Sequence, residues 1–239
     1  MRLSVGIKLG VWLALLGTVS TALTGYYVYE RSRELLIKSS QEKLLTATQV
    51  LAQRFSGSLA NISADVEFIA SLPLLQLICK TSVDSPRLPA RKKQLADIFS
   101  GLLETRSAYS QIRLIGIDNY GKELVRVDRK GGKKGEIEII TGSDLQEKGY
   151  LPYFFETLRL QPGQFYVSRI SLNQEQGAHY GFGKPTIRIA TPIRRQNGSP
   201  FGTVVINVDL NNLFNLISTE IPQDLKTLLA NDAGDYLIH

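Results

Sequence analysis

An uncharged stretch of 21 residues near the amino terminus, residues 9–29, limits the fold of this chain more than any other feature. As an α-helix it reaches about 32 Å, which is enough to cross the hydrocarbon core of a bilayer. The next most apolar stretch, residues 203–217, is interrupted by asparagines and an aspartate, which lipid does not accommodate. The sequence therefore predicts one membrane span, at residues 9–29, and no second span in this chain.

The charges that flank the span predict its orientation. Arg2 and Lys8 precede it, whereas the two acids and two arginines within residues 30–34 cancel one another. Because basic flanks stay in the cytoplasm, we expect the amino terminus inside the cell and the rest of the chain outside it. A cleaved signal peptide is the alternative, since residues 20–22 fit a small-x-small cleavage site. The uncleaved anchor is favoured, because the apolar stretch continues to three tyrosines within residues 26–29.

The exported part has the composition of an ordinary globular chain. All 22 acids and 26 of the 28 lysines and arginines follow residue 29, so this part carries a net charge of +4. Its basic residues come in short clusters, which are more typical of solvated surfaces than of nucleic-acid contacts. Cys79 is the single cysteine, and the two histidines, His179 and His239, fall in different predicted modules. We therefore expect no disulfide, no metal, no cofactor and no nucleic-acid partner.

Residues 30–72 contain no proline, and apolar or small side chains recur three and four positions apart. This spacing predicts a long helix that continues from the span and presents one apolar face. The face either packs on a sheet or pairs with a second copy of the chain. Thr48 and nearby serines interrupt a coiled-coil seam, so we expect the helix to lie on a sheet, with homodimer contact nearer the membrane.

The rest of the chain changes to strand periodicity. A loop is predicted at residues 84–89 and a helix at residues 91–106. Further helices are predicted at residues 150–160 and 211–218. Alternating side chains predict strands at residues 110–117, 123–128, 137–140, 165–168, 186–193 and 201–209. This order predicts an α+β domain, in which helices pack on one face of an antiparallel sheet.

The patterns divide the chain into four parts. Residues 1–8 are the cytoplasmic terminus, residues 9–29 the span, and residues 30–218 one large module. Residues 219–239 resemble the opening hairpin of a second module, because turn residues at 231–234 separate two short apolar runs. An isolated hairpin is marginally stable in water, so we expect these residues to belong to a larger unit.

Seven stretches of the large module follow one another in a characteristic order. They are Gln111-Ile-Arg-Leu-Ile, Gly121-Lys-Glu-Leu-Val-Arg-Val, Tyr153-Phe-Phe-Glu-Thr, Gly163-Gln-Phe-Tyr-Val-Ser, Ser171-Leu-Asn-Gln-Glu-Gln-Gly, Lys184-Pro-Thr-Ile-Arg-Ile-Ala-Thr-Pro-Ile and Gly202-Thr-Val-Val-Ile-Asn-Val-Asp-Leu. Their order and spacing resemble the membrane-distal module of the double Cache sensor regions found outside the membrane in bacterial transmembrane receptors. Asp232-Ala-Gly-Asp-Tyr-Leu-Ile-His is similar to the start of the membrane-proximal module.

The resemblance implies a PAS-like fold, with a long helix behind an antiparallel sheet and a pocket for a small molecule in front. In that family, ligand binding shifts the long helix and so signals across the bacterial inner membrane. The amino terminus is similar to the openings of receptors that end in diguanylate cyclase or histidine kinase domains. The chain then corresponds to the amino-terminal part of such a receptor and carries no output enzyme.

Candidate ligand-binding residues come first from the strands. Arg113, Arg126 and Arg188 lie inside predicted strands, and alternation places Asn207 and Asp209 on one face. A planar arginine fork with a nearby acceptor suits an amino acid or another carboxylate. In the alternative interpretation, the strand arginines cap a solvated face or pair with nearby acids, namely Glu123, Asp128 and Glu175.

Three further side chains complete the predicted site. Tyr153 belongs to an aromatic run on the helix at residues 150–160, which presents one face inward and can form a wall of the site. Asn173 and Glu175 lie in a polar loop at residues 171–183, and such a loop can close over a ligand.

Two other functions compete with the sensor. An extracytoplasmic enzyme is disfavoured, because the sequence contains neither a Gly-x-Ser-x-Gly elbow nor a phosphate-binding glycine loop in a strand-to-helix context. A membrane-tethered scaffold without a ligand is the second alternative, and it leaves the strand arginines without a role. The sequence therefore favours a small-molecule sensor that is not itself an enzyme.

Overall fold

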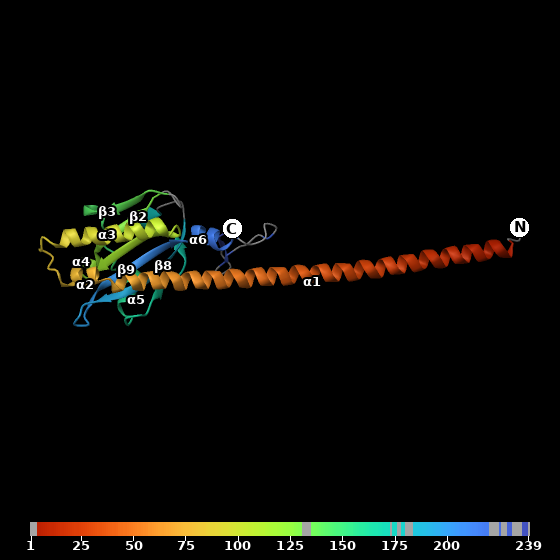
Figure 1. The fold of residues 1–239 in the computed structure, drawn as a ribbon, viewed down its shortest axis with the longest axis horizontal. Coiled ribbons are helices and arrows are strands. Elements are labelled where there is room, and N and C mark those ends of the chain that lie inside the picture. The colour runs from red at the N-terminus through yellow and green to blue at the C-terminus, as the bar shows by residue number, and fades with distance from the viewer. Residues whose placement is uncertain are drawn as a thin grey trace. The chain divides into compact units, whose positions relative to one another are not determined.

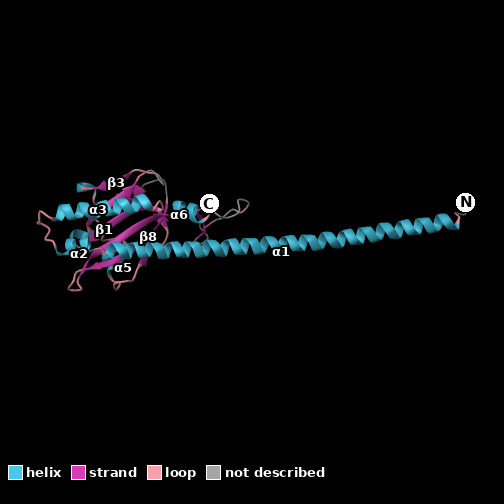
Figure 2. Cartoon of the chain, viewed as in Figure 1, coloured by secondary structure: helices cyan, strands magenta, loops and turns pink. Residues whose placement is uncertain are grey.

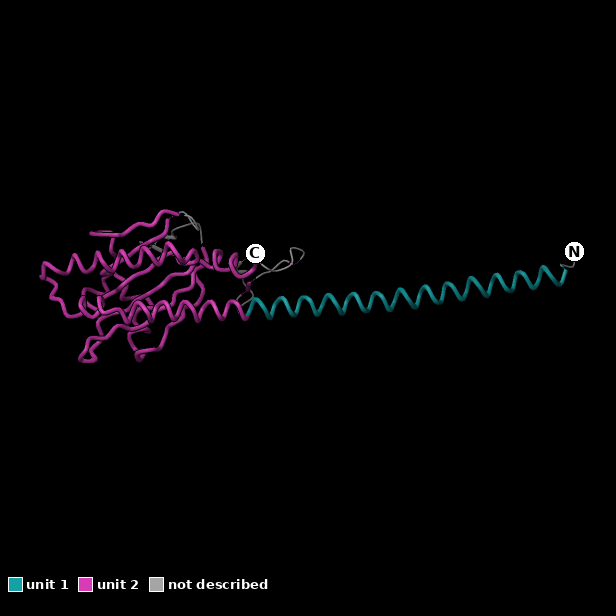
Figure 3. Tube along the Cα trace, in the orientation of Figure 1, with its two compact units in different colours: residues 1–52 teal, residues 53–239 magenta. Residues whose placement is uncertain are grey.

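The computed structural model describes residues 4–130, 135–172, 174–175, 178–179, 184–219, 225, 229–230 and 236–238. The chain divides into two compact units, residues 1–52 and residues 53–239 (Figure 3). The elements follow the chain as shown in Figure 1: α1 (Val5–Ser71), α2 (Pro73–Lys80), α3 (Leu88–Thr105), β1 (Tyr109–Gly116), α4 (Asp118–Gly121), β2 (Glu123–Arg129), β3 (Ile137–Ile140), η1 (Gly142–Asp144), α5 (Pro152–Leu158), β4 (Tyr166–Val167), β5 (Ser171–Leu172), β6 (Gln174–Glu175), β7 (Ala178–His179), β8 (Pro185–Arg194), β9 (Pro200–Asp209), α6 (Leu210–Ile217), β10 (Leu229–Ala230) and β11 (Tyr236–Ile238).

The first unit consists of the amino-terminal part of α1, and the side chains of residues 9–29 are exposed along it. An 18-residue window of this helix has a mean hydropathy of 1.5. Among the described residues, α1 is the one helix that is long and apolar enough to cross a membrane, by length and composition alone. The predicted span lies within it.

The second unit is built on a seven-stranded sheet with the strand order β3-β2-β1-β9-β8-β4, and β5 also pairs with β8. Every pairing in this sheet is antiparallel. The long strands β8 and β9 form its centre together with β1, so their residues are buried on both sides. The predicted α+β class with an antiparallel sheet is confirmed.

One face of this sheet is apolar and lies against α3 and the carboxyl-terminal part of α1 (Figure 2). Strand alternation directs a continuous set of branched side chains to it, which includes Ile112, Leu114, Ile187, Ile189, Val204, Ile206 and Val208. The helices bury Ile62, Val66 and Ile69 from α1 and Leu95, Phe99 and Leu103 from α3. Burial of this apolar surface is the main stabilising contribution to the unit.

The opposite face, called here the polar face, carries the alternate residues of the same strands. Helix α5 packs on it, where Tyr153 and Phe154 form a buried cluster with three small or branched residues, namely Ile115, Ala190 and Val205. The sequence-based prediction that helices pack on one face is therefore wrong in this respect. The reason is that the apolar residues of the polar face gather near α5, and α5 buries them.

Two predicted boundaries also differ from the structure. Helix α1 ends at Ser71, one residue before the predicted end, and Pro73 begins a further helix, α2. Helix α3 begins at Leu88, three residues earlier than expected, with Pro89 in its first turn. Both prolines occupy the first turn of a helix, where the missing N–H group has no partner to lose.

The turn between β1 and β2 has an unusual backbone. Asn119, Tyr120 and Gly121 all have positive φ angles, of 50°, 57° and 73°. The turn contacts a second segment, since the Gly149 N–H donates to the Tyr120 carbonyl at 2.9 Å. A Cβ atom on Gly121 would lie 2.5 Å from the Gly149 nitrogen, so both glycines allow a close backbone approach.

One predicted loop contains strands, and one predicted hairpin is observed. The segment predicted as a polar loop at residues 171–183 holds β5 and the pair β6–β7 in its described part. The predicted hairpin in residues 219–239 is observed as the antiparallel pair β10–β11. Whether it opens a second module stays a prediction.

Candidate functional site

The predicted strand residues meet on the polar face. Antiparallel register places Arg113 of β1 opposite Arg126 of β2, and Asn207 of β9 opposite Arg188 of β8. All four side chains are buried. Tyr153 reaches the same face from α5. Asn173 lies outside the described residues, and of Glu175 the structure describes only the backbone, in β6.

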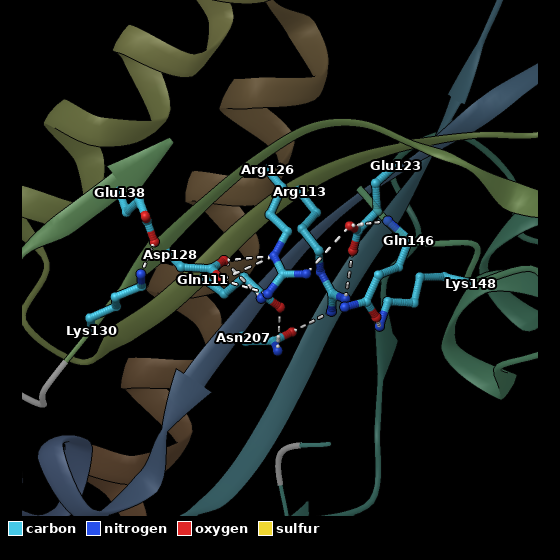
Figure 4. A network of polar contacts seen from close by, with 10 residues as sticks. All are labelled: Gln111, Arg113, Glu123, Arg126, Asp128, Lys130, Glu138, Gln146, Lys148 and Asn207. Carbon is cyan, nitrogen blue, oxygen red and sulfur yellow. Dashed lines mark hydrogen bonds and ion pairs between the residues drawn. The ribbon is translucent and has the colours of Figure 1, made fainter. Parts of the chain in front are cut away.

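Six side chains of the polar face form a closed ring of hydrogen bonds and ion pairs (Figure 4). Arg113 donates to Glu123 at 3.3 Å and to the Asn207 side-chain oxygen at 2.9 Å. Asn207 donates in turn to Gln111 at 2.9 Å, and Gln111 donates to Asp128 at 2.8 Å. Two contacts of Arg126 close the ring, one with Asp128 and one with Glu123. We call this set the polar ring; it joins β1, β2 and β9.

The charged side chains of the polar ring are largely shielded from solvent. The side chains of Arg113 and Glu123 are 1% and 0% exposed, and that of Asp128 is 17% exposed. Charges removed from water in this way need geometrically good partners, because desolvation otherwise exceeds the Coulombic gain. The alternative interpretation of the sequence, in which strand arginines pair with Glu123 and Asp128, is thus observed for Arg113 and Arg126.

A segment before α5 extends the ring. Glu123 accepts a hydrogen bond from the Gln146 N–H at 2.9 Å, and the Gln146 side-chain oxygen accepts one from Lys148 at 2.6 Å. Lys148 is buried, with an exposed fraction of 3%. Its own backbone N–H donates to the Gly121 carbonyl at 2.8 Å. This segment therefore brings a further buried cation to the ring.

Two guanidinium groups lie over the ring of Tyr153. The Arg113 Cζ atom is 5.2 Å from the centre of the tyrosine ring, and the Arg188 Cζ atom is 5.6 Å from it. Cation–π attraction holds planar guanidinium groups in such positions. Arg188 also donates to the Ser171 hydroxyl at 2.8 Å, which links β8 to the edge strand β5.

Asp209 is a helix cap in this structure. Its Oδ1 atom accepts hydrogen bonds from the N–H groups of Asn211 and Asn212, at 3.0 Å and 3.3 Å, and so begins α6. Lys184 lies 3.7 Å from its other oxygen. Asp209 shares the polar face, as alternation predicts, and it lies at the carboxyl end of β9, two residues after Asn207 of the polar ring.

Sequence reasoning missed three members of the site, namely Gln111, Gln146 and Lys148. Gln111 lies two residues before Arg113, so the same alternation that selected the arginine also selects this glutamine. Gln146 and Lys148 carry no such signal, because they lie outside any regular element, and the backbone N–H of Lys148 contacts the β1–β2 turn. Among the described residues no group of acids, histidines and cysteines is arranged to hold a metal ion.

A long amino-terminal helix and a short helix on opposite faces of an antiparallel sheet, with charged side chains gathered on one face, define a sensor-type α+β module. The family model for the sensor domain of bacterial histidine kinases matches residues 74–239. The chain belongs to this family, and the resemblance drawn from the sequence is confirmed.

Solved structures share the fold at low sequence identity. A domain of a sensory box/GGDEF family protein from Vibrio parahaemolyticus superposes with a TM-score of 0.71 at 22% identity, over 83% of this chain and 71% of that one. The extracellular domain of the histidine kinase vpHK1S-Z8 gives 0.63 at 21% identity, over 74% and 60%.

A third relative was solved with a ligand. The ligand-binding domain of the Campylobacter jejuni chemoreceptor Tlp3, in complex with L-norvaline, gives a TM-score of 0.54 at 16% identity, over 81% of this chain and 65% of that one. The chain thus spans about two thirds of the length of these structures. A comparison with curated proteins finds no match.

Proposed function

We propose that the chain is the small-molecule-sensing, extracytoplasmic region of a receptor anchored in the bacterial inner membrane. Residues 9–29 form the anchor, residues 30–218 the membrane-distal sensor module, and residues 219–239 the beginning of a membrane-proximal module. Family membership and the apolar part of α1 support this assignment. The charge asymmetry around the span supports the export of the module.

The convergence of Arg113, Arg126, Arg188 and Asn207 with Tyr153 on one buried face is the observation that carries the proposal. These residues come from four strands and one helix, and a fold does not need so many buried polar groups in one place for its stability. Chemoreceptor domains of the same fold were solved with L-norvaline and with isoleucine bound, which supports a ligand site in this architecture. Arg188 and Tyr153 are the proposed contacts to the ligand, and the polar ring supports them.

The proposed signal leaves through α1. This helix is shared by both compact units, so a change in its packing against the sheet changes the helix on the membrane side as well. A homodimer through the long helix would bring two such helices together. The chain itself holds no recognisable catalytic motif, and its output would belong to a separate domain.

Thermal unfolding of the full chain in detergent micelles tests the ligand site. A metabolite present at about 100 times its dissociation constant should stabilise the chain by about 2.7 kcal/mol, which raises the melting temperature. Arg188→Ala should abolish this shift and keep the melting temperature without ligand close to that of the wild type. Arg159→Ala, at a side chain that is 72% exposed, is the matched control and should retain the full shift.

Two outcomes would contradict the proposal. If no metabolite of a broad panel raises the melting temperature, the scaffold interpretation replaces the sensor. If Arg188→Ala binds the ligand as tightly as the wild type does, the ligand site lies elsewhere in the chain.

A further inference from the structure

The proposed contacts to the ligand are covered in this structure. Arg188 and Tyr153 are 8% and 6% exposed, and Arg113, whose guanidinium group also lies over the tyrosine ring, is 1% exposed. A ligand therefore reaches Arg188 and Tyr153 only after an element has moved. Strands β1, β8 and β9 are joined to one another by continuous antiparallel ladders, which leaves α5, the helix that carries Tyr153, as the element that moves.

Both flanks of α5 are anchored to the sheet. On the carboxyl side, Arg194 of β8 donates a hydrogen bond of 2.9 Å to the Leu160 carbonyl. On the amino side, the backbone N–H and carbonyl of Gln146 form two hydrogen bonds with Glu123 of β2, both of 2.9 Å (Figure 4). The stretch between these anchors contains α5, so the helix can leave the sheet while its two flanks stay in place.

Residues 147–151, called here the strap, join the amino-side anchor to α5. The Lys148 N–H donates to the Gly121 carbonyl at 2.8 Å, and the Gly149 N–H donates to the Tyr120 carbonyl at 2.9 Å. Both acceptors belong to the turn between β1 and β2. The strap therefore fastens the amino end of α5 to this turn.

The turn that receives the strap has a strained backbone. Tyr120 has a φ angle of 57°, and its neighbours Asn119 and Gly121 have positive φ angles as well. Glycine adopts this conformation freely and asparagine tolerates it, but it is unfavourable for a bulky residue. The Tyr120 side chain is 83% exposed, so packing of its ring does not offset the strain. Detachment of the strap would let the turn relax, and the strain therefore weakens the attachment.

We propose that α5 is a lid over the ligand site and that the strap is its latch. The strap detaches from the strained turn to admit the ligand, and it attaches again to close the site. The strain at Tyr120 keeps this attachment reversible. The inference rests on the proposed function, since it describes how the ligand enters the same site, but its test needs no ligand.

Lys148 reports on the latch, because it belongs to the strap and is 3% exposed. The full chain in micelles is treated with the N-hydroxysuccinimide ester of acetic acid, and mass spectrometry of its peptides gives the rate at which each lysine is acetylated. Lys93, with a side chain that is 75% exposed, gives the rate for an accessible lysine. The buried Cys79 of α2, treated with iodoacetamide, reports on the rest of the fold. Lys148 should be acetylated while Cys79 stays protected.

Two substitutions of Tyr120 separate the backbone from the side chain. Tyr120→Gly removes the Cβ atom that makes a positive φ unfavourable, so it should slow acetylation of Lys148 about fivefold. Tyr120→Ala is the matched control, because it removes the exposed ring and keeps the Cβ atom. It should leave the rate of Lys148 unchanged.

A third variant opens the latch. A Cβ atom on Gly149 would lie 2.5 Å from the Tyr120 carbonyl oxygen, so Gly149→Ala should prevent the strap from attaching. Lys148 should then be acetylated at nearly the rate of Lys93, while Cys79 stays protected and the circular dichroism spectrum stays that of a folded chain.

Three outcomes would overturn the inference. One is an equal rate of Lys148 in the wild type, Tyr120→Gly and Gly149→Ala. Another is exposure of Lys148 and Cys79 together, which would show unfolding of the whole unit. Equal slowing by Tyr120→Gly and Tyr120→Ala would assign the effect to the ring instead of the strain. None of these rates depends on a ligand, so their failure is distinct from the failure of every metabolite to raise the melting temperature, which contradicts the proposed function.

Discussion

The Tyr109 phenol donates a hydrogen bond of 2.6 Å to the Asp65 carboxylate, and this contact joins strand β1 to helix α1. Asp65 also accepts from Arg106, which follows α3, at 3.0 Å. Tyr109 is buried, with an exposed fraction of 3%. Three elements of the second unit thus meet at one carboxylate, and β1 is also the strand that carries Gln111 and Arg113 of the polar ring.

We expect Tyr109→Phe to destabilise the second unit by about 1–2 kcal/mol, because a buried hydrogen bond to a carboxylate is lost while the aromatic ring remains. Urea unfolding followed by far-ultraviolet circular dichroism measures this difference. Equal midpoints for the variant and the wild type would contradict a stabilising role for the contact.

The same pair predicts a dependence on pH. Burial, the hydrogen bond to Asp65 and the negative charge of Asp65 all raise the pKa of Tyr109 above its usual value of about 10. The folded state therefore keeps the phenol neutral, so its stabilising effect is complete below pH 10 and is lost as the pH rises further. The stability difference between the wild type and Tyr109→Phe should shrink by up to about 1.4 kcal/mol per pH unit above pH 10. If the stability difference between the wild type and Tyr109→Phe stays constant between pH 8 and pH 11, the pKa of Tyr109 is not raised by folding.

Glu123→Gln should be strongly destabilising. The carboxylate contacts two buried guanidinium groups, and its removal leaves both without this charge partner. The expected loss is about 3–5 kcal/mol in urea unfolding. Asp97→Asn makes the same chemical change in the exposed pair with Lys93 and should cost less than about 0.5 kcal/mol. Similar losses in the two variants would show that the polar ring contributes no more than a surface pair.

Gly202→Ala should disrupt the pairing of β1 with β9. A Cβ atom at this position would lie 2.0 Å from the Ile115 carbonyl oxygen, which is backbone and cannot turn away. We expect a loss of about 3 kcal/mol or more, measured as a lower urea midpoint. Gly57→Ala, inside α1, meets no atom within 4 Å and should stabilise by about 0.5–1 kcal/mol. The prediction fails unless Gly202→Ala lowers the free energy of unfolding and Gly57→Ala raises it.

Cys79 should react slowly in the folded chain. Burial raises the pKa of its thiol to about 11, so the reactive thiolate is about 100-fold scarcer than for an ordinary cysteine at pH 8. Iodoacetamide labelling followed by mass spectrometry measures the rate in buffer and in urea. Labelling in buffer at the rate found in urea would show that the thiol is accessible.

The faces of the strands were predictable because alternation is a local property. Arg188 and Asn207 lie on the polar face in the structure, as the period of two requires, and their strand neighbours Ile187, Ile189, Ile206 and Val208 lie on the other face. Helix α3 was predictable for the same reason, since its apolar residues recur with helical spacing.

The partners of the arginines depend on longer distances. Arg113 and Asn207 are 94 positions apart, and their contact follows from the register of β1 on β9. Asp209 illustrates a local competition: strand alternation selects it as a site residue, whereas its position before α6 makes it a cap. The sequence around Asp209 fits both a site residue and a helix cap. In the structure β9 ends at Asp209, so this residue caps α6.

The closed form of the polar ring has a mechanical consequence. A chain of contacts separates when one link opens, but a cycle separates only when two links open together. The ring therefore joins β1 to β2 and β1 to β9 by two contacts each, and sliding one strand past its neighbour breaks both contacts at once. Tyr153 and Arg188 belong to α5 and β8, outside these three strands.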